Sequence, residues 1–236
     1  MKRRDLLSAA GIGIAGSIIP ALSPIPALAQ DAAPDYPLMG KPLKPPANGP
    51  VQVAFVIAPH TVLIDLAGPW EAFYDSMSGF HLYTVAPSMD MVTMGGLKVL
   101  PDYTFENAPK PNVVVVPQSK ELPETIAYIK DAAKDADVTM SICTGALLVA
   151  KAGLFDGLHA TTHHNAYDAL AQFPKVKLVR GPRFVEEANV SSSGGETSGI
   201  DLALRVVERY YGKSAARSAI STLEFVSAKR ALPWTK

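Results

Sequence analysis

The chain has 236 residues, and its 22 basic side chains (Lys and Arg) balance its 22 acidic ones at pH 7. A neutral balance gives no electrostatic reason to expect nucleic acid or an anionic membrane as a partner. The single cysteine excludes an internal disulfide. The length is that of one domain with a full hydrophobic core.

The N-terminal residues 1–29 have the pattern of a secretory signal. A basic start with paired Arg3 and Arg4 precedes an apolar Gly/Ala-rich stretch, and small residues end at Ala29. The arginine pair indicates the twin-arginine route and a periplasmic location. A retained membrane anchor is the weaker interpretation, because Gly and Pro interrupt a short apolar run.

Cleavage after Ala29 would leave 207 residues, of which 19 are basic and 21 acidic. Residues 30–50 are rich in proline and lack periodicity, which favours an extended leader. We expect one domain over residues 51–236.

Strand and helix patterns alternate along this domain, as in an α/β protein. Continuous apolar runs at 51–58 and 112–117 are typical of strands covered on both faces. Further strands are predicted at 80–86, 138–142, 159–162, 176–179 and 190–193, with a hairpin-like piece at 91–105. Helices are predicted at 68–77, 122–135, 144–153, 165–172, 198–211 and 214–227. The economical arrangement is a mostly parallel sheet between helix layers.

Cys143 ends one predicted strand and begins a predicted helix, which is the position of a nucleophile elbow. The backbone N–H groups of Thr144 and Gly145 lie at the start of that helix, where they favour negative charge. We therefore expect a thiol pKa below its usual value of about 8.5. Gly145 should also let the helix start pack tightly against neighbouring backbone. A buried cysteine that only fills space is the alternative.

The stretch "SICTGALLVAKAGLFDGLHATTHH" resembles the nucleophile-elbow segment of the ThiJ/PfpI superfamily. Three more stretches match: "IDLAGPWEAF", "ATTHH" and "SSGGETSGIDLALRVVER". The resemblance spans residues 51–226 and implies a flavodoxin-like α/β fold related to class I glutamine amidotransferases. Within the superfamily, the likeness is greatest to isonitrile hydratases and to amidase-like domains fused to AraC-type regulators.

The resemblance implies roles for several residues. In the isonitrile hydratases a matching aspartate transfers protons beside the nucleophile, and Asp65 inherits that role. Asp65 can instead be read as a turn or N-cap residue for the following helix. Thr144 can offer an amide and a hydroxyl group.

His163 follows Cys143 by 20 positions, a spacing at which some superfamily members have a histidine. A histidine can act as the base for a thiolate, but the stretch 161–163 reads equally well as polar residues that bond loop backbone. His164 stands where hydratase-like relatives usually have tryptophan.

One departure from the family concerns Gln118 and Ser119. The family typically has two glycines after this strand, and their backbone helps to form an oxyanion hole. A backbone amide at Gln118 can still donate, with side chains now at that rim. Gly195, in a Gly/Ser-rich turn, is a further candidate for lining the pocket. No metal cluster can be assembled from the histidines.

The leading hypothesis is a cysteine-dependent hydratase or hydrolase of a small carbon–nitrogen substrate, with an isonitrile converted to an N-substituted formamide. Cys143 would attack the terminal carbon, and Asp65 would protonate the carbanion and then activate water. These steps require no cofactor or metal.

Other functions stay open. The same dyad can hydrate a 2-oxoaldehyde, as glyoxalase-type enzymes do, or hydrolyse an amide. A non-catalytic ligand or redox sensor is the alternative of another class. A regulator would need a separate DNA-binding segment, and export speaks against transcription. Family habit and apolar helix faces such as Leu202, Val206 and Val207 predict a homodimer.

Overall fold

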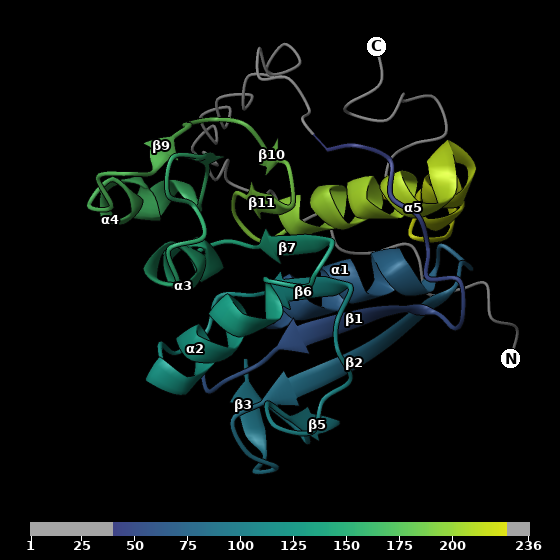
Figure 1. Ribbon diagram of the computed structural model, residues 1–236, viewed down its shortest axis with the longest axis horizontal. Helices are drawn as coiled ribbons and strands as arrows, with labels where there is room; N and C mark the ends of the chain where they lie inside the picture. Colours follow the sequence, from purple (N-terminus) through teal and green to yellow (C-terminus); the bar gives the residue numbers. More distant parts are fainter. Residues whose placement is uncertain (1–39, 226–236) are drawn as a thin grey trace, which may run out of the picture. The chain divides into compact units, whose positions relative to one another are not determined.

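The computed structural model describes residues 40–225 (Figure 1). The predicted signal, the first part of the leader and the end of the last predicted helix lie outside this range. Within residues 40–225, no helix has the length and apolar character that crossing a membrane requires.

A seven-stranded sheet forms the centre of the protein, in the order β10-β11-β7-β6-β1-β2-β5 (Figure 1). All neighbouring pairs are parallel except β10 with β11. The mostly parallel flavodoxin-like sheet is thereby confirmed. Its strands are β1 (Val51–Val56), β2 (Phe80–Ala86), β5 (Tyr103–Thr104), β6 (Val113–Val116), β7 (Val138–Ser141), β10 (Phe184–Glu187) and β11 (Val190–Ser193).

Two short pairs of strands stand apart from this sheet. β3 (Val92–Met94) and β4 (Leu97–Val99) make the expected antiparallel hairpin, and β8 (His159–Ala160) pairs in parallel with β9 (Lys177–Leu178). The helices are α1 (Leu63–Tyr74), α2 (Pro123–Ala132), α3 (Gly145–Lys151), α4 (Tyr167–Leu170), α5 (Ser198–Thr222) and the 3₁₀ turn His164–Ala166.

α5 contains the break that the sequence predicts between two helices. Gly212 has φ 80° inside it, so the chain kinks there rather than continuing as one regular helix. A positive φ is readily adopted only by glycine, which explains why the two helical patterns meet at this residue.

The prediction of a helix beginning at residue 68 is wrong, because α1 begins at Leu63. Gly68 and Pro69 look like a helix start, yet they lie in its middle. A Cβ atom at position 68 would lie 2.8 Å from Ile200 of α5, so glycine permits the close packing of α1 on α5. The earlier start places Asp65 in the first turn of α1.

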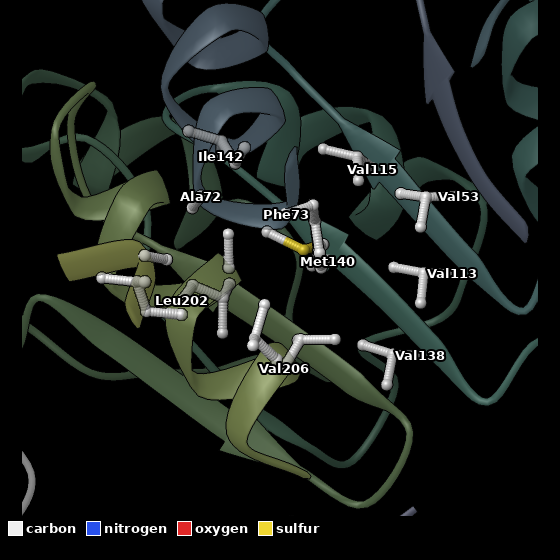
Figure 2. Packing of buried hydrophobic residues seen from close by; sticks show 14 of the residues in the cluster. Val53, Ala72, Phe73, Val113, Val115, Val138, Met140, Ile142, Leu202 and Val206 are labelled. Atoms are coloured by element: carbon white, nitrogen blue, oxygen red, sulfur yellow. The ribbon is translucent and has the colours of Figure 1, made fainter. Parts of the chain in front are cut away.

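Two hydrophobic clusters hold the layers on the sheet. Val53 and Phe55 of β1 belong to the cluster with α1 and α5, and Figure 2 shows side chains of this cluster. The alternate residues Ala54 and Val56 belong to a cluster with α2 and α3. A strand with both faces buried explains the continuous apolar run of β1.

Leu202, Val206 and Val207 lie inside the first of these clusters, with exposed fractions of 0%. They pack against the sheet and are not available to a second subunit, so the predicted use of these residues as a dimer surface is wrong. Amphipathic spacing alone does not tell a core-facing stripe from an interface stripe.

Residues 40–50 contain no helix or strand, and their first part is bound to the domain. Arg205 donates to the carbonyl of Gly40 at 3.1 Å, and Arg209 donates to the carbonyl of Lys41 at 2.9 Å. The N–H of Leu43 donates to the carbonyl of Arg209 at 2.7 Å.

The same two arginines explain β10, a strand that the sequence analysis missed. Glu186 of β10 is fully buried, and each arginine approaches its carboxylate to 3.1 Å. Two adjacent glutamates obscure the strand pattern in the sequence, because the ion pairs that permit burial come from distant residues.

We expect Glu186→Ala to lower the free energy of unfolding by about 3–5 kcal/mol, because Arg209 would remain buried without its carboxylate partner. Urea unfolding measures this. The matched control is Asp131→Ala, whose partner Lys134 is also exposed, and this variant should unfold like wild type. A Glu186→Ala variant that matches the control would contradict the assignment.

Candidate active site

Cys143 lies at the corner between β7 and α3, with φ 56° and 4% of its surface exposed. Its N–H donates to the carbonyl of Gly194 at 3.0 Å, and its carbonyl accepts from the hydroxyl of Thr162 at 2.9 Å. A non-glycine residue in this conformation costs about 1–3 kcal/mol and persists only where the surroundings enforce it. The strained corner is the nucleophile elbow that the sequence predicts.

Gly145 brings the start of α3 against the end of β6. A Cβ atom at this position would lie 2.2 Å from the carbonyl oxygen of Val116, a distance that no side chain tolerates. The prediction of tight backbone packing at Gly145 is confirmed. This contact sets Cys143 beside the residues that follow β6, of which Gln118 is the second.

Gln118 connects Asp65 with Cys143. Its backbone N–H donates to Oδ2 of Asp65 at 3.1 Å. The thiol of Cys143 donates to Oε1 of the Gln118 side chain, with an Sγ–O distance of 3.2 Å. The backbone amide of Gln118 is therefore bonded to Asp65 in this structure, whereas the sequence analysis expected it to be able to donate at an oxyanion hole.

Asp65 is fully buried in the first turn of α1, and not before the helix as the predicted start at residue 68 implied. The N-cap of α1 is Val62, so the alternative reading of Asp65 as a helix cap is wrong. Among the described residues, Oδ1 of Asp65 has no hydrogen-bond partner. One carboxylate oxygen is thus held and the other is left to exchange a proton.

Burial raises the pKa of Asp65 to about 7, because the charged form loses its hydration. The N–H of Gln118 lowers this pKa, and the negative charge of Glu196 raises it further. A carboxyl group with a pKa near neutrality is suited to act as both acid and base at physiological pH.

The prediction of a lowered thiol pKa at Cys143 is wrong. Burial is the largest cause that raises the pKa of this thiol to about 11, and the charge of Asp65 is the next. The N–H groups of Thr144 and Glu196 lower the pKa, and the charge of Glu196 raises it. α3 has only seven residues, so the field at its start does not outweigh burial beside two carboxyl groups.

The amide donors at the sulfur are those of Thr144 and Glu196. The N–H of Gly145, which was expected to be the second donor, bonds instead to the carbonyl of Ile142 at 2.9 Å. Glu196 was missed by the sequence analysis. Its signal is topological, since the loop after β11 ends beside the corner after the neighbouring strand β7. Glu196 has φ 39°, so this loop is also strained.

His163 lies near this loop without a hydrogen bond to Cys143 among the described residues. Its Nδ1 accepts from the N–H of Asn165 at 3.2 Å, and its ring lies tilted by 33° against the ring of His164 with centroids 4.2 Å apart. A Cβ atom at Gly195 would lie 2.4 Å from the His163 ring, so these two residues are in contact. Thr162 and His163 bond loop backbone, as the alternative interpretation states, whereas the hydroxyl group of Thr161 has no partner among the described residues.

No group of three or more His, Cys, Asp or Glu side chains within residues 40–225 is placed to hold a metal ion. The charged groups that act on the Cys143 thiol are the carboxyl groups of Asp65 and Glu196. The site thus combines a buried thiol, two carboxyl groups and two backbone N–H donors.

The family model described as "DJ-1/PfpI family" matches residues 51–209. The chain belongs to this family. It is 31% identical to isonitrile hydratase of Pseudomonas putida over 185 residues, which cover 75% of this chain and 80% of the hydratase. It is also 28% identical to the HTH-type transcriptional regulator GbdR of Pseudomonas aeruginosa over 192 residues, and it spans about half of that regulator.

Solved structures agree on the fold. A ThiJ/PfpI family protein from Pseudomonas syringae superposes with a TM-score of 0.69 at 29% identity, covering 91% of this chain and 88% of that protein. DJ-1 of Schizosaccharomyces pombe superposes with a TM-score of 0.63 at 19% identity, covering 73% of this chain and 98% of DJ-1.

The raised pKa of Asp65 predicts how stability depends on pH. The pKa of Asp65 is about 7 in the folded protein and 3.8 for an ordinary aspartate, so ionisation of Asp65 makes the folded protein less stable. This loss of stability is absent below pH 3.8, grows as the pH rises and is complete above pH 7. It amounts to on the order of 4 kcal/mol, because one pKa unit corresponds to about 1.4 kcal/mol.

We therefore expect Asp65→Asn to be more stable than wild type at pH 8 but not at pH 4. Urea unfolding across this range measures the difference, with the exposed residue changed in Asp90→Asn as the control. A difference that stays constant from pH 4 to pH 8 would show that Asp65 titrates normally.

Proposed function

We propose that this protein is a cysteine-dependent hydratase that converts a small isonitrile into an N-substituted formamide. The observation that carries the proposal is the buried Asp65, which shares Gln118 as a hydrogen-bond partner with the Cys143 thiol. The similarity of the chain to isonitrile hydratase of Pseudomonas putida supports the choice of an isonitrile as substrate.

The chemistry begins with the proton of the thiol. Because the pKa values of Cys143 and Asp65 are about 11 and about 7, this proton rests on sulfur at neutral pH. Transfer to the Asp65 carboxylate is uphill by on the order of 5 kcal/mol, which is a modest part of an enzymatic barrier. The N–H groups of Thr144 and Glu196 stabilise the resulting thiolate.

The thiolate then attacks the terminal carbon of the isonitrile, forming the S–C bond. Asp65 returns its proton to that carbon, and the product is a thioimidate bound to the enzyme. The Asp65 carboxylate next takes a proton from water as the C–O bond forms, and passes it to the substrate nitrogen.

Breakage of the C–S bond completes the turnover. The new hydroxyl group loses its proton to Asp65 as the carbonyl forms, and Asp65 reprotonates the departing thiolate. The net reaction adds one water to the isonitrile and returns Cys143 and Asp65 to their starting states. Each step uses the carboxyl group alternately as acid and base.

We expect Asp65→Asn to lower turnover by about 10²–10⁴-fold, because Asn keeps the shape and the bond from Gln118 but carries no proton. Cys143→Ala should abolish turnover. Product formation from short alkyl isonitriles, measured with the purified mature protein, tests both variants, and Asp90→Asn is the control. Near-wild-type turnover by Asp65→Asn would rule out Asp65 as the proton donor.

A substrate panel that includes methylglyoxal and simple amides tests the 2-oxoaldehyde and amidase alternatives.

Ligand sensing is the second candidate function, and the similarity to the GbdR regulator favours it. A sensor would bind its ligand equally well with Cys143→Ala, whereas a hydratase would lose turnover. Redox sensing is less well supported, since a thiol pKa of about 11 leaves little of the reactive thiolate at neutral pH.

We also propose, from the sequence, that the protein is exported and dimeric. Export by the twin-arginine route predicts that Arg3→Lys with Arg4→Lys removes the protein from the periplasmic fraction.

The segment 89–100 exposes apolar side chains suited to a subunit contact, namely Met89, Met91, Leu97 and Leu100. Light scattering of the periplasmic protein should give the mass of two mature chains. The mass of one mature chain would overturn the dimer proposal. A double variant that still reaches the periplasmic fraction would overturn the export proposal.

A further inference from the structure

The Gln118 side chain accepts a hydrogen bond from the Cys143 thiol, with an Sγ–Oε1 distance of 3.2 Å. It is half-buried. The backbone around it is fixed, since its N–H donates to Asp65 at 3.1 Å and its carbonyl accepts from Val62 at 3.0 Å. The side chain can therefore change its orientation while the loop stays in place.

We propose that Gln118 is a further catalytic residue, whose carboxamide accepts from the Cys143 thiol at rest and, once reversed, donates from Nε2 to the thiolate. This inference rests on the proposed role of Cys143 as a nucleophile. It concerns a residue that stands where the family typically has glycine backbone.

A carboxamide suits this exchange because it offers an acceptor and a donor at the same distance from its final carbon. Reversal requires only rotation about the last side-chain torsion, which has no sharp preferred values. The S–H group is a weak donor, whereas a hydrogen bond to an ionised sulfur is charge-assisted and about twice as strong as a neutral one. The reversed carboxamide therefore favours the thiolate.

The charges around the sulfur favour such a donor. The N–H groups of Thr144 and Glu196 face the sulfur, and the carboxyl groups of Asp65 and Glu196 oppose its negative charge. The backbone N–H of Gln118 bonds to Asp65 instead. A third donor from the Gln118 side chain would offset the two carboxyl groups when the proton leaves sulfur.

The same geometry extends to the bound substrate. An atom joined to Sγ lies within reach of a group 3.2 Å from that sulfur. In the thioimidate, the substrate nitrogen is two bonds from Sγ, and Nε2 of Gln118 can donate to its lone pair. This bond would favour substrates with a hydrogen-bond acceptor next to the attacked carbon.

The test is the rate of Cys143 alkylation by iodoacetamide as a function of pH, which needs no knowledge of the substrate. Gln118→Met keeps the approximate length of the side chain and removes both hydrogen-bonding atoms. We expect it to raise the pKa of the Cys143 thiol and to slow alkylation at pH 8 by about tenfold. Gln118→Glu, which accepts but does not donate when ionised, should slow it further.

Gln172→Met makes the same substitution at an exposed residue and should alkylate like wild type. If Gln118→Met destabilises the fold, as a thermal melt would reveal, Gln118→Asn withdraws the carboxamide by one methylene group and serves instead. An unchanged pH profile, or a lowered thiol pKa, would overturn the proposal. If wild type reacts with iodoacetamide as expected but hydrates no isonitrile, the proposed function fails and the role of Gln118 still stands.

Discussion

Burial of the Asp65 carboxyl group in the first turn of α1 is the constraint on which the rest of the site depends. Its surface is fully covered, and within residues 40–225 its carboxylate has one hydrogen-bond donor, the backbone N–H of Gln118. A single donor does not replace the lost hydration of a carboxylate. The group is consequently held near the balance between its two protonation states, which is the property that proton transfer requires.

The fold brings this carboxyl group and the thiol together from three neighbouring strands. α1 follows β1, Gln118 follows β6 and Cys143 follows β7, and these strands are adjacent and parallel. Their carboxyl ends meet at one edge of the sheet, where ligands of open α/β sheets bind. Gly145 closes the arrangement, since any larger residue would separate α3 from the end of β6.

The resting site holds its proton on sulfur, and this has a consequence for selectivity. Two carboxyl groups raise the thiol pKa, and the offsetting partners are uncharged N–H groups. An anionic substrate would be repelled, whereas a small neutral one such as an isonitrile would enter without electrostatic cost. In the proposed reaction the thiolate forms only during turnover, so the resting protein keeps Cys143 as a thiol, which is oxidised more slowly than a thiolate.

The sequence predicted what local chemistry determines. The elbow at Cys143, the tight packing at Gly145 and the break at Gly212 follow from backbone preferences of a few neighbouring residues. The sequence did not predict strand β10, in which Glu186 is buried, because its partners Arg205 and Arg209 lie on α5. The start of α1 was misplaced because Gly68 and Pro69 resemble a boundary, while packing on Ile200 overrides that signal.

The thiol pKa and the part played by Glu196 were beyond sequence reasoning for a related reason. Both depend on burial and on charges that three loops bring together. A helix start was expected to dominate, but α3 is short and the desolvation of Cys143 is larger than the effect of its amide donors. Such balances are set by tertiary structure alone.

The most direct test of this account is the titration of Asp65 itself. Carbon-13 NMR of protein labelled at aspartate carboxyl carbons, with Asp65→Asn used to assign the signal, reports the protonation of this one group. The account predicts a midpoint near the value of about 7 that burial imposes. A midpoint near the 3.8 of an unperturbed aspartate would contradict it.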